Sequence, residues 1–197
     1  MRLRRLIAPA IAILPLVLSA CSGHGAHGEA QPSAATETTT RLGIDDDDVA
    51  FARDMIAHHR QAVEMADLAL APTAAASAPV RALASRIKAT QGPEIEQMTQ
   101  WLVGWGQPVA LADHDGHDMD QMTGMMTDEE MAQLAGAKGA DFDTLWLSLM
   151  IEHHRGATEQ ASTARTAGSD TGVIELADRV ITSQQAEIAE MQGLLDG

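Results

Sequence analysis

An internal repeat is the feature that most constrains this chain. Met55-Ile56-Ala57-His58-His59-Arg60 recurs as Met150-Ile151-Glu152-His153-His154-Arg155. A second segment follows each copy in the same order, with Leu83-Ala84, Gln91, Glu94-Ile95 and Met98 matching Leu176-Ala177, Gln184, Glu187-Ile188 and Met191. Two matches in one order indicate a duplicated helical hairpin. Because a single hairpin cannot bury its apolar face alone, we expect the two copies to pack together as a four-helix bundle.

Composition and periodicity agree with an all-α fold. The chain is rich in Ala and has no Tyr, 2 Phe and 3 Trp, which favours helix over sheet. The apolar spacing predicts helices over residues 46–70, 77–105, 127–137, 141–166 and 170–195, the third being short. We expect Ser77, Thr127 and Asp141 to cap the second, third and fourth helices. Gly139 is predicted to break the third helix and Gly92-Pro93 to kink the second.

The N-terminal residues differ in character from the rest. Residues 1–20 begin with several arginines, followed by an apolar run that is too short to span a membrane. The run ends in a Leu-Ser-Ala-Cys box, and the three features together predict a lipoprotein signal peptide. Cys21 would then carry the lipid, whereas a plain secretory signal would leave Cys21 free. Residues 21–43, which are rich in small and polar side chains, are predicted to be a flexible tether.

Residues 44–197 are predicted to form the bundle domain. It divides into hairpin one (45–105), a His/Met-rich loop with the short helix (106–139) and hairpin two (140–197). The predicted location is the periplasmic or extracellular side of the membrane, with the lipid anchor as the only membrane contact.

Charge and cysteine content argue against several classes of function. The chain has 28 Asp and Glu against 13 Lys and Arg, a formal net charge of −15. A surface of this kind repels phosphate backbones, which argues against nucleic-acid binding. With 1 Cys, the chain can form neither an internal disulfide nor a multi-thiolate metal site.

Histidine and methionine carry the chemistry of the two hairpins. All 8 histidines occur in pairs, either adjacent or three residues apart, and two imidazoles so placed can serve one metal ion. On a helix, methionines share a face with the paired histidines, although Gln160 replaces the second methionine in hairpin two. The candidate metal ligands on the bundle are Met55, His58, His59, Met65, Met150, His153 and His154. The spacing leaves open whether the two pairs share one site or form two.

The loop before the short helix adds a second group of soft ligands. Its candidates are His114, His117, Met119, Met122, Met125 and Met126, while His24 and His27 lie in the tether. Cu(I) prefers thioether and imidazole ligands, and methionine does not form disulfides in an oxidising compartment. The ligand set therefore favours copper, as Cu(I), with other transition metals as alternatives.

Motifs for catalysis are absent from the sequence. It contains no Gly-x-Ser-x-Gly, no phosphate-binding glycine loop, no His-Glu-x-x-His and none of the Glu-x-x-His pairs of di-iron bundles. We therefore expect a binding protein and no catalytic residue. Two alternatives stay open: a metal-dependent oxidase that uses iron, manganese or copper, and an interaction module whose histidine pairs cap a polar core. Each methionine could also serve only as core filler.

At these motifs the chain resembles a bacterial family, domain of unknown function 305 (DUF305). The resemblance covers about residues 45–195 and rests on Met55-x-x-His58-His59, Gln91-x-x-Glu94-Ile95-x-x-Met98, Gly124-Met125-Met126-Thr127 and Met150-x-x-His153-His154. It implies a ferritin-like bundle in exported, often lipid-anchored proteins, with His and Met as metal ligands and members implicated in copper binding and resistance.

One position departs from the family pattern. A His often precedes the Gly-Met of the middle motif, and here that position holds Thr123. Either His114 and His117 replace this ligand, or the loop site is weaker. The sequence as a whole predicts an extracytoplasmic protein that binds copper for storage, transfer or resistance, with a copper chaperone or efflux component as a candidate partner.

Overall fold

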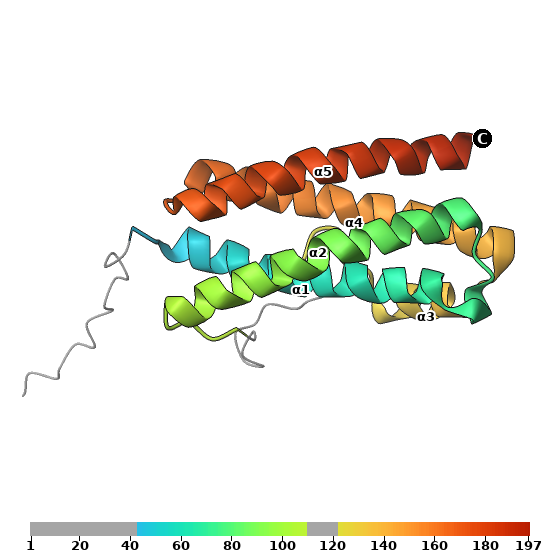
Figure 1. Ribbon diagram of the computed structural model, residues 1–197, viewed down its shortest axis with the longest axis horizontal. Coiled ribbons are helices and arrows are strands. Elements are labelled where there is room, and N and C mark those ends of the chain that lie inside the picture. Colours follow the sequence, from blue (N-terminus) through green and yellow to red (C-terminus); the bar gives the residue numbers. More distant parts are fainter. Residues whose placement is uncertain (1–42, 110–121) are drawn as a thin grey trace, which may run out of the picture. The chain divides into compact units, whose positions relative to one another are not determined.

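A computed structural model describes residues 43–109 and 122–197, and these residues form an all-α bundle (Figure 1). The elements are α1 (Asp46–Leu70), the 3-10 turn η1 (Pro72–Ala74), α2 (Ala78–Gly104), α3 (Asp128–Gly136), α4 (Gly139–Ala167) and α5 (Thr171–Asp196). Four long helices and one short connecting helix confirm the predicted fold class. The predicted signal peptide, the tether, Cys21, His24, His27, His114, His117 and Met119 lie outside the described residues.

Side-chain caps set most of the helix starts. Asp45 caps α1 in a reciprocal capping box with Asp48, and Ser77 caps α2 by accepting the Val80 N–H. Thr127 and Glu130 form the predicted capping box of α3. These caps satisfy backbone donors that have no partner within the helix. Helix α2 continues through Pro93.

The start of α4 differs from the prediction. Lys138 is its N-cap and makes no side-chain cap, while Asp141 lies in the first turn. Gly139 does not break a helix but begins α4, with φ at +59°. A glycine adopts this left-handed conformation without strain, so the chain turns from α3 into α4 through two residues, and no capping aspartate is needed.

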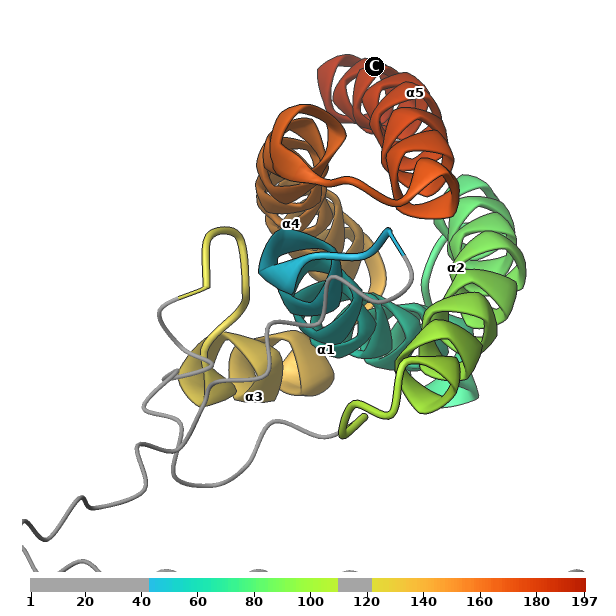
Figure 2. The same ribbon diagram turned by 90° about the vertical axis from the view of Figure 1, so that its left-hand side faces the viewer.

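The two hairpins pack through their first helices. Helix α1 pairs with α2 and α4 pairs with α5. Helices α1 and α4 lie side by side, and the outer helices α2 and α5 lie together on the other side of the bundle (Figure 2). The short α3 lies against α1 and α4 on the side away from α2 and α5. Buried Asp48 joins the hairpins, because its carboxylate accepts the backbone N–H groups of Ser169 at 3.1 Å and Asp170 at 3.0 Å.

The interior consists of two apolar cores. The Trp146 core includes Ala62, Met65, Ala66 and Ala69 of α1, Val80, Leu83, Ala84 and Ile87 of α2, Phe142, Trp146, Leu147, Met150 and Ile151 of α4, and Met191 of α5. The Phe51 core includes Val49, Phe51, Ala52, Met55 and Ile56 of α1, Met98 and Leu102 of α2, Ala157, Ala161 and Ala164 of α4, and Val173, Leu176, Ala177 and Val180 of α5. Between the two cores, each long helix contributes polar side chains that are buried or partly buried. We call them the polar layer: His58, His59, Gln91, Glu94, His153, His154, Gln184 and Glu187.

Candidate metal site

The polar layer brings the two histidine pairs together. The rings of His58 on α1 and His153 on α4 are in contact, with centroids 3.8 Å apart. His154 lies beside them, its ring centroid 6.3 Å from that of His153. The four imidazoles are 0 to 1% exposed. The pairs therefore converge at one place in the centre of the bundle, a point that the sequence spacing left open.

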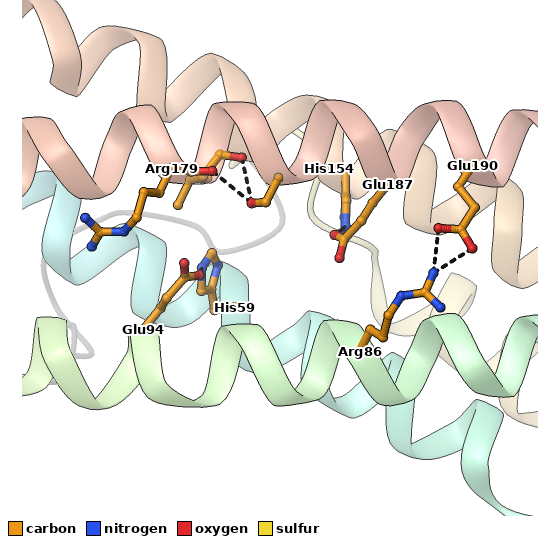
Figure 3. A network of polar contacts seen from close by, with 9 residues as sticks. His59, Arg86, Glu94, His154, Arg179, Glu187 and Glu190 are labelled. Carbon is orange, nitrogen blue, oxygen red and sulfur yellow. Dashed lines mark hydrogen bonds and ion pairs between the residues drawn. The ribbon is translucent and has the colours of Figure 1, made fainter.

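Each outer helix contributes a carboxylate to this layer. His59 Nε2 lies 2.8 Å from Glu94 Oε2 of α2, and His154 Nε2 lies 2.8 Å from Glu187 Oε2 of α5 (Figure 3). An ionised carboxylate can only accept a hydrogen bond, so Nε2 is the donor in each pair, and in a neutral ring this leaves Nδ1 as the acceptor nitrogen. Carboxylates that orient ligating histidines in this way are common around metal sites.

Many polar atoms of the layer have no hydrogen-bond partner. Both ring nitrogens of His58 and of His153, and Nδ1 of His59 and His154, are buried and unpaired. The same holds for both amide atoms of Gln91 and for the Gln184 Oε1. A buried polar atom without a partner costs about 1–3 kcal/mol, and folded proteins contain few of them. Such a cluster, at the centre of a bundle and lined with lone pairs, fits a bound cation.

Burial keeps the central imidazoles neutral. Loss of hydration first, and then the neighbouring His59 and His154, lower the pKa of His58 to about 3. The same causes, burial first and then the charge of His58, place the pKa of His153 well below its usual value. At neutral pH both rings therefore hold no extra proton, and their nitrogens are free to act as ligands.

The candidate methionines of the bundle lie in the cores on either side of the layer. Met55 and Met98 belong to the Phe51 core, whereas Met65, Met150 and Met191 belong to the Trp146 core, and all five are fully buried. Among residues 43–109 and 122–197, no three His, Cys, Asp or Glu side chains are grouped so that they could hold a metal ion.

The end of the His/Met-rich loop is docked against α1 and α4. The Gln61 side chain donates to the Met126 carbonyl at 2.8 Å and accepts the Met126 N–H at 2.7 Å. On the other side, a Cβ on Gly156 would lie 2.0 Å from the Thr123 carbonyl oxygen, so only glycine fits there. The Thr123 backbone also lies near the His58 ring, without hydrogen-bond geometry, and slightly opposes the lowering of its pKa.

These docking residues were not among the predicted site residues. Their signal is nevertheless in the repeat, because Gln61 and Gly156 occupy equivalent positions two residues after the paired histidines. Of the loop methionines within the described residues, Met126 is buried, while Met122 and Met125 are half-buried. On the surface of α4, Arg155 forms an ion pair with Glu152.

Comparison with known sequences shows the family. The profile described as Domain of unknown function (DUF305) matches residues 48–195. This chain is a member of the DUF305 family. No curated protein matches it.

Solved structures of this family share its fold. A DUF305 protein from Streptomyces coelicolor that is inferred to be secreted is 36% identical, with a TM-score of 0.69 over 76% of this chain and 92% of that one. A DUF305 fragment from Deinococcus radiodurans is 30% identical, with a TM-score of 0.68 over 78% and 97%. CopM in its Cu(I)-bound form is 31% identical, with a TM-score of 0.63 over 76% and 95%, and is also known in Cu(II)- and Ag-bound forms.

The described residues include no helix that is long and apolar enough to cross a membrane.

Proposed function

We propose that this DUF305 protein binds copper as Cu(I), for storage, transfer or resistance. The observation that carries the proposal is the set of buried imidazole nitrogens without partners in the polar layer. A bound cation would give those lone pairs a partner and would offset the free-energy penalty of burying them. The fully buried position favours an ion that sheds its water readily, and Cu(I) is such an ion.

The identity of the ligands supports a soft cation. His58, His59, His153 and His154 supply imidazole nitrogens, and Met55, Met65 and Met150 supply thioethers from the adjoining cores. Imidazole with thioether suits Cu(I) better than the harder divalent ions. The Cu(I)-, Cu(II)- and Ag-bound forms of CopM support the same class of cargo. We assign a further, weaker capacity to His114, His117, Met119, Met122, Met125 and Met126.

We further propose that the protein acts outside the cytoplasm. The predicted lipidation of Cys21 would hold it at the membrane surface, with residues 21–43 as the tether. The inferred secretion of the Streptomyces coelicolor relative supports export. A copper chaperone or an efflux component would be the partner that delivers or removes the metal.

Competition with a Cu(I) chelator tests the proposal. Replacing His58 and His153 together by Ala should abolish tight binding, since both central ligands are lost. The matched variant His114→Ala with His117→Ala should keep the tight site and lose only weaker capacity. Circular dichroism would verify that both variants fold. Unchanged affinity and stoichiometry in the His58/His153 variant would contradict the proposal.

A further inference from the structure

The polar layer is closed on most sides by the protein itself. Along the bundle axis, the Trp146 core lies on one side of the layer and the Phe51 core on the other. Both cores consist of fully buried apolar side chains. A metal ion that reached the imidazoles along the axis would have to cross a dry, close-packed core, which is unfavourable for a charge.

The docked segment 122–126 closes the face opposite α2 and α5. Its backbone at Thr123 and Gly124 contacts α4 at Gly156, where even a methyl group has no room. Gln61 of α1 holds Met126 through two hydrogen bonds. Figure 2 shows this segment on the side of α1 and α4 that faces away from the outer helices. The segment therefore covers the contact between α1 and α4 where His58 meets His153.

The face between α2 and α5 carries a groove of about 470 Å³, lined by Thr90 and Glu94 of α2 and by Asp178, Arg179, Thr182 and Ser183 of α5. Glu94 thus touches the groove and His59 at once, and its side chain is 14% exposed, whereas the ring is fully buried. In Figure 3, Glu94 and Glu187 lie between Arg179 on one side and the Arg86–Glu190 ion pair on the other.

We propose that metal ions enter and leave the polar layer through the groove between α2 and α5, where the Glu94 carboxylate receives them at the entrance before they reach the unpaired imidazole nitrogens inside. This inference rests on the proposed function and adds the route to it. A carboxylate that is partly exposed can replace some of the water around a cation before the buried imidazoles take it. Glu187 makes the same bond to His154 but does not line the groove, so the route is assigned to the side of hairpin one.

The test is the rate at which the full chain takes Cu(I) from its coloured complex with bicinchoninate, followed in a stopped-flow instrument without oxygen. Thr182→Trp fills the groove from α5 without touching an imidazole, and Thr90→Trp fills it from α2. We expect each variant to slow the uptake of Cu(I) by about tenfold or more, because the bulky ring obstructs the path of the ion. The equilibrium affinity for Cu(I) should be unchanged.

Thr163→Trp is the matched control. Thr163 is an exposed helical threonine whose hydroxyl donates to the carbonyl four residues earlier, as that of Thr182 does. It lines a different groove, beside Phe51 and Gln160. We expect its uptake rate to match that of the unmodified chain. Uptake at the wild-type rate in both groove variants would overturn the route, and so would an equal slowing in the Thr163→Trp control. In either case an unchanged affinity for Cu(I) would still support the proposed function. Failure of the unmodified chain to bind Cu(I) would overturn the function and the route together.

Discussion

The two hairpins supply the polar layer with the same parts at the same positions. His59 bonds to Glu94 as His154 bonds to Glu187, and both distances are 2.8 Å. Two residues further along the inner helices the copies differ, since α1 has Gln61 where α4 has Gly156. The amide holds the backbone of the loop end, and the glycine lets the same segment approach α4. The duplication thus accounts for the symmetry of the polar layer. The difference between Gln61 and Gly156 beside it allows segment 122–126 to cover the face formed by α1 and α4.

The largest effect that tests this symmetry is acid destabilisation. The pKa of His58 falls to about 3 in the folded protein, whereas an unfolded histidine titrates near 6.5. Only the unfolded state takes up that proton between these values, so stability is complete above pH 6.5 and declines as the pH falls toward 3. Each such histidine lowers the free energy of unfolding by about 1.4 kcal/mol for every pH unit below 6.5, or by about 3 kcal/mol at pH 4.5.

Urea unfolding as a function of pH measures this loss and compares the hairpins. His58→Leu should reduce the slope of stability against pH by roughly one proton, and His153→Leu should do the same. Unequal changes would show that the two central imidazoles are not equivalent. An unchanged slope in both variants would refute the assignment of neutral buried histidines.

The next effect concerns the position where the hairpins differ. Gly156→Ala places a methyl group against the Thr123 carbonyl, so the docked segment must shift, at about 1–3 kcal/mol. Gly193→Ala is the matched control, because no atom lies within 4 Å of its Cβ position in α5. It should stabilise the helix by about 0.5–1 kcal/mol. The urea midpoint should fall in Gly156→Ala and rise in Gly193→Ala relative to the unmodified chain. Changes of the same sign in both variants would refute the close docking of the segment.

A smaller effect is expected where the hairpins are alike. Glu94→Gln and Glu187→Gln each remove the charge that orients an imidazole while keeping the side-chain shape. We expect each to lower Cu(I) affinity about tenfold, as outer partners of ligating histidines do. Chelator competition gives both values. A large loss in one variant with no loss in the other would break the symmetry of the layer.

The smallest effect belongs to the surface. Arg86 of α2 and Glu190 of α5 form an ion pair across the outer helices, but their side chains are 51% and 47% exposed. Water and salt screen such a pair, so Arg86→Ala should change stability by about 1 kcal/mol or less. A loss well above that, measured by urea unfolding, would mean that the ion pair and not the interior holds α2 to α5.

The sequence predicted the fold well because its signals were local or repeated. Helix α1 begins and ends where the apolar spacing predicted, and the Thr127 capping box starts α3. The duplicated hairpin predicted the four-helix bundle. Asp141 was misjudged as a cap because the positive φ of Gly139, which begins α4 earlier, depends on the turn between two packed helices.

The site was predicted only in part. The paired histidines were identified from their spacing, while Glu94 and Glu187 appeared only as matching positions of the repeat. The convergence of the two histidine pairs could not be predicted from the sequence, because the spacing of residues along one helix does not tell how the neighbouring helix is placed against it. The docking role of Gly156 was also hidden, since it follows from the distance of its backbone to Thr123, a contact between segments far apart in the sequence.

Anomalous scattering at the copper edge, from a crystal of the full chain grown with Cu(I), tests the central claim most directly. The account predicts a strong peak inside the polar layer, within bonding distance of an imidazole nitrogen of His58 or His153. Peaks found only at surface carboxylates or at the loop histidines, with an empty layer between α1 and α4, would contradict it.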